Sequence, residues 1–186
     1  MFLSILQDAR LYEVLHRLDV DLAQAARASG CRHCNGVLHS AHYARKPRGG
    51  PPGLGPEIDR RLSFCCARDG CRRRTTPLSV RFLGRRVYFG AVVLLASALR
   101  DGLTARRVRA LRDQLGVDVR TLRRWRRWWQ EAFVKSDFWR AARARFAPPL
   151  AESALPGALL ERFSAETSPG GLVPTLLFLA PISQGH

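Results

Sequence analysis

Four of the five cysteines in this 186-residue chain fall into two close groups. Cys31 and Cys34 form a CxxC motif followed by Gly36, and Cys66 and Cys71 are separated by four residues. A tight turn presents two thiolates to one metal, and a glycine allows the backbone to turn beneath them. The two groups therefore predict a closed structural Zn²⁺ site with no open position for water. Its predicted ligands are Cys31, Cys34, Cys66 and Cys71.

Neighbouring residues offer alternatives for this ligand set. Cys65 could replace Cys66, but adjacent strand residues point in opposite directions, so only one of them can face the metal, and we favour Cys66. His33, His39 and His42 lie nearby in the sequence, and any one of them could substitute for a cysteine. Reduced structural cysteines without a metal are the remaining alternative.

A second chemically suggestive stretch spans residues 117–135. Read at the helical period, its large apolar side chains share one face: Leu122, Trp125, Trp129 and Phe133. The opposite face carries Arg120, Arg123, Arg124 and Arg127. Only Glu131 opposes these arginines, and like charges one turn apart destabilise a free helix. An anionic partner is therefore expected, and arginines on a helix of this kind can read guanine in the DNA major groove.

The positive charge of the chain is confined to its centre. The net charge is +16, and residues 60–145 contain 23 basic and six acidic residues, against eight basic and nine acidic elsewhere. Such a block is typical of a polyanion-binding protein. The 29 arginines against two lysines suit phosphate and base recognition, although a GC-rich genome would produce the same bias.

The sequence favours nucleic acid over membrane as the anionic partner. No amphipathic anchor, lipidation signal or secretory signal is evident, and the longest apolar run, residues 87–99, is too short to span a bilayer. We therefore expect a soluble, cytoplasmic (nucleoid-associated) protein with no membrane partner.

The N-terminal half of the chain must position the cysteines. Residues 8–29 predict an amphipathic helix whose apolar stripe is Leu11, Leu15, Leu18, Leu22 and Ala26, with Asp19 off the stripe. Residues 37–44 and 58–64 predict two strands, joined by an irregular loop at 46–56. A strand edge after the last cysteine would display Arg72, Arg73 and Arg74 to phosphate. An equal alternative is that these arginines bind no ligand, are solvated, and protect the exposed strand edge from pairing.

Three helices are predicted around the arginine face: residues 85–100, residues 105–115 capped by Thr104, and a third that begins at about Asp118 after a break at Gly116. In the first, Val87 begins the buried face. In the second, Val108, Leu111 and Leu115 point inward. Three helices with a short glycine turn before the third form a helix-turn-helix unit. Arg106, Arg107, Arg109 and Arg112 on its second helix would hold backbone phosphates.

The remaining residues extend this organisation. Residues 137–146 predict a helix with further arginines, residues 159–163 a short helix, residues 172–179 an apolar segment, and residues 183–186 a frayed end. The predicted fold class is α+β, mostly α, with a small zinc ribbon packed beside a helix-turn-helix domain. The predicted segments are an N-terminal helix at 1–30, the ribbon at 31–84, the helix-turn-helix at 85–136 and a C-terminal extension at 137–186.

On these residues the chain resembles the zinc-ribbon plus helix-turn-helix proteins of bacterial mobile elements. The resemblance is carried by CRHCNG at 31–36, CCARDGCRRRTTP at 65–77 and the three helices at 85–133. Transposases of this type carry a catalytic domain with three separated acidic residues after the helix-turn-helix. The 51 residues after Lys135 are too few for a nuclease fold. The resemblance therefore implies DNA binding without catalysis.

These features predict a zinc-containing reader of double-stranded DNA, a transposon accessory factor or a transcriptional regulator, and not an enzyme. A transposase or another nucleic-acid enzyme is a candidate partner. The alternatives are an RNA or ribonucleoprotein binder that stacks bases on its tryptophans and, less favoured, a subunit of a nucleic-acid-processing enzyme. The sequence contains no P-loop, GxSxG, HExxH or dinucleotide fingerprint.

Overall fold

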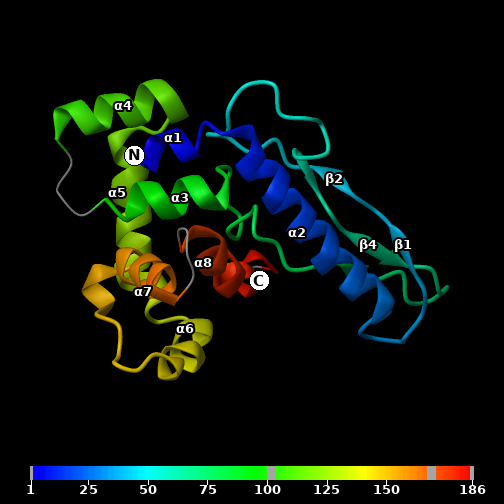
Figure 1. Ribbon diagram of the computed structural model, residues 1–186. Helices are drawn as coiled ribbons and strands as arrows, with labels where there is room; N and C mark the ends of the chain where they lie inside the picture. Colours follow the sequence, from blue (N-terminus) through cyan, green and yellow to red (C-terminus); the bar gives the residue numbers. More distant parts are fainter. Residues whose placement is uncertain (1, 100–103, 167–170, 185–186) are drawn as a thin grey trace.

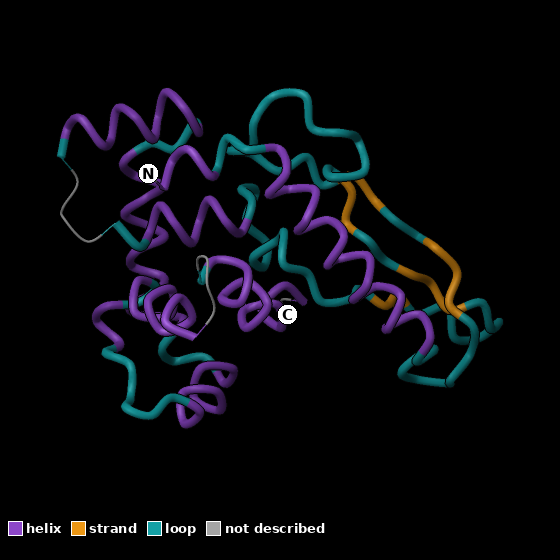
Figure 2. Tube along the Cα trace, in the orientation of Figure 1, coloured by secondary structure: helices purple, strands orange, loops and turns teal. Residues whose placement is uncertain are grey.

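A computed structural model of the chain describes residues 2–99, 104–166 and 171–184. It has the predicted α+β class, with helices predominating over two small antiparallel sheets (Figure 2). The helices are α1 (Phe2–Ile5), α2 (Ala9–Ala28), α3 (Gly90–Ser97), α4 (Ala105–Leu115), α5 (Val119–Trp128), α6 (Asp137–Ala142), α7 (Gly157–Glu166) and α8 (Leu172–Leu179). In Figure 1, α3 to α8 gather at one end of the molecule, and α2 runs beside the strands at the other.

The strands are short and belong to two sheets. They are β1 (Leu38–Ser40), β2 (Tyr43–Ala44), β3 (Arg60–Arg61), β4 (Phe64–Cys66) and β5 (Arg74–Thr75), in the orders β1-β4-β5 and β2-β3. The predicted strand at 37–44 is interrupted, because the chain passes from one sheet to the other between β1 and β2. The predicted strand at 58–64 is interrupted in the same way, because the chain also changes sheets between β3 and β4. The loop at 46–56 is irregular, as predicted.

Helix α2 links the two ends of the molecule. Asp8 accepts a hydrogen bond from the backbone of Arg10 at its start, and Ser29 caps its end. Its fully buried residues are Tyr12, Leu15, Asp19 and Ala23. The predicted stripe is therefore rotated, since Leu11, Leu18, Leu22 and Ala26 are only partly buried. Tyr12 and Leu15 belong to the helical core, whereas Ala23 packs in a second, smaller core with Cys31, Leu38 and Phe64.

A buried ion pair joins α2 to the segment between β5 and α3. Asp19 Oδ2 lies 2.8 Å from Arg81 Nε, and both side chains are 0% exposed. Asp19 also accepts hydrogen bonds from the Ser79 hydroxyl (2.6 Å) and the Val80 amide (2.7 Å). Arg81 donates to the carbonyls of Glu57, Ile58 and Arg60. The prediction that Asp19 lies on the polar side of α2 is wrong, because its partners come from 60 residues further along the chain.

Helix α3 is shorter than the predicted helix at 85–100. Residues 87–89 are extended: the Arg48 amide donates to the Val87 carbonyl (2.7 Å), and the Phe89 amide donates to the Arg48 carbonyl (3.1 Å). Val87 is therefore 53% exposed and not buried as predicted. The eight residues of α3 that follow are all buried.

Helices α4 and α5 begin and end close to the predicted positions. The Thr104 side chain caps α4, and Gly116 ends it in the left-handed conformation, with φ +63°. Asp118 then caps α5 by accepting a hydrogen bond from the Thr121 amide (2.7 Å). The turn between the two helices thus contains only residues 116–118. In Figure 1, α5 runs crosswise to α3 and α4.

The predicted helix at 117–135 does not stay α-helical throughout. After α5 the chain forms a π-helical turn, Trp129–Phe133, which is a wider turn than an α-helix makes. The rings of Trp129 and Phe133 pack 4.7 Å apart inside this turn, and both are buried. The wider turn keeps two bulky aromatic side chains in the core on the face that α5 buries.

The C-terminal helices complete the core. Phe133 contacts Trp139 of α6 at a ring distance of 5.2 Å, and Phe138 contacts Phe178 of α8 at 5.3 Å. Ser183 is buried rather than frayed, because its hydroxyl accepts a hydrogen bond from the Ser79 amide (2.8 Å). Residues 185–186 lie outside the described residues. One apolar core therefore contains residues from all four predicted segments of the chain.

We predict that Asp19→Asn destabilises the fold by about 3–5 kcal/mol, because it leaves Arg81 charged and buried without a counter-charge. Chemical denaturation measures this loss as a lower free energy of unfolding. Asp21→Asn is the matched control, since Asp21 is exposed on the same helix, and its cost should stay within about 0.5 kcal/mol. Equal costs for the two variants would contradict the role of the buried pair.

Candidate metal centre and arginine surface

Four thiols meet where the end of α2 reaches the three-stranded sheet. The sulfur atoms of Cys31, Cys34, Cys66 and Cys71 all lie within 4.8 Å of one another. The Cys31 and Cys71 sulfurs are 3.8 Å apart, and those of Cys34 and Cys66 are 3.4 Å apart. A tetrahedral Zn²⁺ with Zn–S bonds of about 2.3 Å separates its sulfurs by about 3.8 Å. The four cysteines therefore form a cluster that can hold a metal ion.

The first turn of the cluster follows α2 directly. The Asn35 amide donates to the Cys31 carbonyl (2.8 Å), and Asn35 adopts a left-handed φ of 55° that asparagine tolerates. A Cβ at Gly36 would lie 3.1 Å from the Cys66 sulfur and 3.3 Å from the Cys34 sulfur. A side chain at this position would crowd two sulfurs of the cluster, so glycine is favoured here by close packing. The expected reason, a backbone turn that needs glycine, does not apply, because Gly36 is not among the glycines with positive φ.

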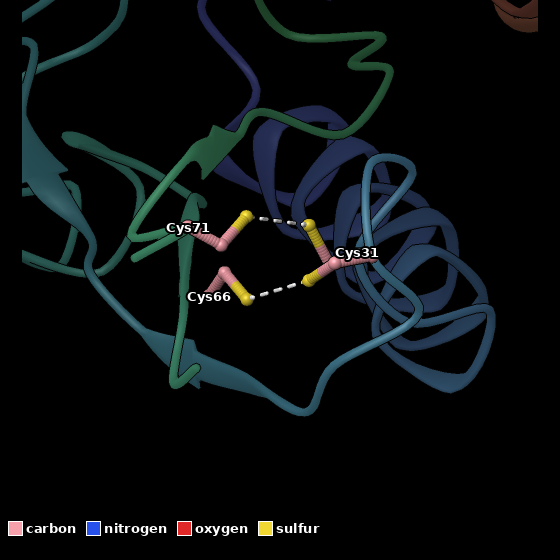
Figure 3. Close-up of side chains that lie close together, drawn as sticks. Cys31, Cys66 and Cys71 are labelled. Atoms are coloured by element: carbon pink, nitrogen blue, oxygen red, sulfur yellow. Dashed lines mark hydrogen bonds between the residues drawn. The ribbon is translucent and has the colours of Figure 1, made fainter. Parts of the chain in front are cut away.

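The second turn comes from the end of β4. Gly70 and Arg72 both have positive φ, at 82° and 43°, and the Cys71 amide donates to the Arg68 carbonyl (3.1 Å). Strand β4 alternates as expected: Cys66 is buried and faces the other three thiols, whereas Cys65 points away and donates to the Arg72 carbonyl (3.3 Å). The geometry agrees with the choice of Cys66 over Cys65. In Figure 3 a dashed line joins the sulfur of Cys71 to that of Cys31, and the sulfur of Cys66 points to the same side.

The thiols of the cluster perturb one another. Hydrogen bonding from the His33 backbone lowers the pKa of Cys31 to about 7 against the effect of burial. At Cys66, a backbone hydrogen bond from Arg68 favours the thiolate, but burial and the neighbouring thiols outweigh it and raise the pKa to about 12. Like charges in one site resist full ionisation, so a divalent cation is the natural complement of this cluster.

The nearby histidines lie outside the cluster. His33 Nδ1 is 3.1 Å from the Arg73 guanidinium, and His42 Nδ1 accepts a hydrogen bond from the Ser63 amide (3.1 Å). His39 is exposed on β1. Among the described residues, the only group of three or more potential ligands that could hold a metal consists of the four cysteines.

The arginine face of α5 has an acidic side chain near it, Asp118 at the start of the helix. A hydrogen bond from the Thr121 backbone, and to a lesser extent the charge of Arg124, lowers the pKa of Asp118. Leu122, Trp125, Trp129 and Phe133 are at most 3% exposed, as the helical period predicts. On the other side, four arginines are exposed and have no hydrogen bond or ion pair with any described residue: Arg120, Arg123, Arg124 and Arg127. Arg126 lies at the edge of the core, half-buried, and donates to the Leu99 carbonyl. Four guanidinium groups are therefore available to an external anion.

The arginines of α4 form a second part of this surface. Arg106, Arg109 and Arg112 are exposed and unpaired within the described part of the chain. Arg107 differs from the prediction, since it is half-buried and already has an interaction. Three of the four predicted phosphate contacts on α4 therefore remain free for a ligand.

The arginine run after the last cysteine is engaged within the protein. Arg72 pairs with Asp69 (2.8 Å), Arg73 contacts His33, and Arg74 donates to the Ala41 carbonyl (2.8 Å). Arg74 also donates to the Ser63 hydroxyl (2.9 Å). Arg74 therefore holds the edge of β5 in place. The three arginine side chains are less available to phosphate than arginines without intramolecular partners would be.

One basic group beside α5 has no counterpart in the sequence prediction. Arg86 stacks on Trp128, with its guanidinium carbon 3.7 Å from the ring centroid. Burial, and then the charge of Arg124, lowers the pKa of Arg86 to about 10. Arg86 lies before α3, in a stretch that was predicted to be helical and is not, so no helical pattern could have placed it against α5.

Comparisons with known proteins give no relative for this chain. No protein-family model matches it, and neither curated protein sequences nor solved structures gave a match. Among the described residues, none of the helices has the length and hydrophobicity needed to cross a bilayer. Inference about function therefore depends on the geometry of the cysteine cluster and the arginine surface.

We predict that Cys66→Ser lowers metal affinity more than about 100-fold, whereas Cys65→Ser leaves it unchanged, because only Cys66 faces the other three thiols. Titration with Co²⁺ follows the thiolate-to-metal absorption band of each variant. Metal content after purification provides an independent check. Equal loss in both variants, or wild-type binding by Cys66→Ser, would contradict the assigned ligand set.

Proposed function

We propose that this protein binds double-stranded DNA through α4, the turn at 116–118 and α5, used as a helix-turn-helix. The observation that carries the proposal is the pair of opposite faces on α5. Its aromatic face is buried, and its four exposed arginines have no partner among the described residues. A rigid helix that offers unpaired guanidinium groups suits the DNA major groove, where arginine pairs with guanine O6 and N7.

Helix α4 would hold the DNA backbone while α5 reads bases. Arg106, Arg109 and Arg112 are exposed along α4 and could meet phosphates. Phosphate contacts fix the position of a protein on DNA and carry no direct sequence information. The proposal thus gives the two helices separate tasks.

The proposed resident metal is Zn²⁺, held by Cys31, Cys34, Cys66 and Cys71. Four sulfur ligands fit the coordination of structural zinc and leave no position for a substrate. Zinc would stabilise the ribbon end of the molecule, as structural zinc sites do in small domains. We infer a structural metal and a DNA-binding protein without a catalytic centre, of the kind that accompanies mobile elements or regulates transcription.

The positions of the tryptophans favour DNA over single-stranded RNA as the ligand. Base stacking needs an exposed aromatic face. Trp125 is 3% exposed and Trp129 is 0% exposed. One face of Trp128 is occupied by the Arg86 guanidinium. The aromatic side chains of α5 thus offer little surface on which an RNA base could stack.

Selection from a random duplex DNA library tests the proposal. We predict enrichment of a motif that contains guanine, because guanine is the base that arginine pairs with most often. Parallel selections with Zn²⁺ and with a chelator test the contribution of the ribbon, and the chelated protein should lose the enrichment. Failure to enrich any motif with Zn²⁺ present would contradict sequence-specific reading by α5.

A pair of triple variants tests which arginines bind. We predict that Arg120→Gln/Arg123→Gln/Arg127→Gln lowers affinity for the selected duplex at least about 100-fold. The matched control removes three exposed arginines that form ion pairs with Asp8, Asp137 and Glu152: Arg10→Gln/Arg140→Gln/Arg143→Gln. Both variants lose the same net charge, so fluorescence anisotropy should separate a specific surface from general charge. Similar losses in the two variants would contradict binding by α5.

A further inference from the structure

A shallow pocket lies beside the arginine face of α5, where the extended residues before α3 meet that helix. Its volume is about 420 Å³. Arg85, Arg86 and Arg124 supply its charged groups, and Tyr88, Trp125 and Trp128 supply aromatic walls. No acidic residue is among the described residues that line it. The pocket therefore combines three positive charges with a partly apolar floor.

Arg86 is fixed in this pocket before any ligand arrives. Its guanidinium stacks on Trp128, and Nη1 donates to the Leu83 carbonyl (3.2 Å). Its other N–H groups have no partner within the described part of the chain. Its backbone carbonyl in turn accepts a hydrogen bond from Arg45 (3.2 Å), which helps to hold this part of the chain. A stacked guanidinium loses little conformational entropy when it binds an anion.

The charge of Arg86 in this pocket has no acidic partner among the described residues, whereas Arg124 interacts weakly with the exposed carboxylate of Asp118. Arg86 is half-buried, and it forms no ion pair with a described acidic residue. Arg124 is close enough to lower the pKa of Arg86 further, so the two cations repel each other. A buried or half-buried charge without a partner costs free energy, and an anion bound between the two groups would remove that cost.

The groups exposed in the pocket suit a phosphate better than a base. Tyr88 is 7% exposed and Trp125 is 3% exposed, so neither presents a ring face to a base. Arg86 covers one face of Trp128. Besides the exposed side chain of Val87, the accessible groups are guanidinium N–H donors, which match the oxygens of a phosphate. We propose that the pocket binds one backbone phosphate of duplex DNA between Arg86 and Arg124, with Arg85 at its rim.

This inference rests on the proposed DNA binding and changes the role of one residue. Arg124 becomes a phosphate contact that sets the position of α5 on the duplex. Reading of bases is then left to Arg120, Arg123 and Arg127. A phosphate contact depends mainly on charge, whereas bidentate pairing with guanine depends on the planar guanidinium fork. Lysine substitution therefore distinguishes the two roles.

The test measures affinity for the selected duplex and for an unrelated duplex over a range of KCl concentrations. Arg124→Gln should weaken binding to both duplexes by the same factor and reduce the slope of log K against log[KCl] by about 1. Arg124→Lys should restore most of the affinity and the slope. The matched control is Arg123→Gln on the neighbouring position of α5, outside the pocket, which should instead reduce discrimination between the duplexes.

Arg86→Gln should behave like Arg124→Gln, and its thermal midpoint shows whether it folds. Loss of the stack on Trp128 could destabilise Arg86→Gln. In that case Arg86→Lys serves as the second variant, because it keeps the positive charge. Two outcomes would overturn the phosphate pocket: Arg124→Gln alters sequence preference at an unchanged salt slope, or Arg124→Lys binds no better than Arg124→Gln.

A second measurement needs no DNA and separates the two proposals. Inorganic phosphate, compared with chloride at constant ionic strength, should raise the thermal midpoint of the wild-type protein by binding the folded state. Arg124→Gln should lose most of that rise, and Arg123→Gln should keep it. No rise, or equal losses in the two variants, overturns the pocket and leaves DNA binding standing. A rise in a protein that binds no duplex overturns the proposed function and leaves the anion pocket.

Discussion

Burial of one face of α5 is the constraint on which the arrangement of this protein depends. Trp125 packs edge-on against Tyr88 at 5.0 Å, and Phe133, in the π-helical turn that continues α5, packs against Trp139 at 5.2 Å. These contacts anchor the helix on both sides, from the segment before α3 and from the C-terminal helices. Large buried aromatic side chains allow little rotation of a helix about its axis. The arginines on the opposite face of α5 are consequently held on the exposed side of the helix, so their positive charges face solvent.

The cysteine cluster stands at the other end of the molecule, and α2 connects it to this core. Only two residues separate Cys31 from the end of α2, and Asp19 in the middle of the helix pairs with Arg81. A buried ion pair is weak evidence for stability, but it tolerates few alternative arrangements because each charge needs its partner. Here it fixes α2 against the chain that leads into α3. We therefore expect metal binding at the cluster to stabilise the position of α2 relative to the helices.

Local signals in the sequence predicted more of this structure than long-range ones. The caps Thr104 and Asp118, with Gly116 between them, define α4 and α5 because capping depends on residues within one helical turn. The four clustered cysteines were likewise predicted from spacing and strand alternation. The burial of Asp19 was not predicted, since its partner Arg81 lies 62 residues away in the sequence. The late start of α3 was missed for the same reason: pairing with Arg48 holds residues 87–89 extended despite a helical pattern. No pattern within α5 reveals the stack of Arg86 on Trp128.

We propose that the arginines of α4 and α5 together bind a DNA duplex. The salt dependence of binding tests it most directly, because each phosphate neutralised by an arginine releases condensed counterions. Affinity of the zinc-loaded protein for a duplex, measured from low to moderate KCl, should fall steeply, with a slope of log K against log[KCl] of about −6 if six to eight contacts form. A flat response over the same range would contradict binding of duplex DNA by these arginines.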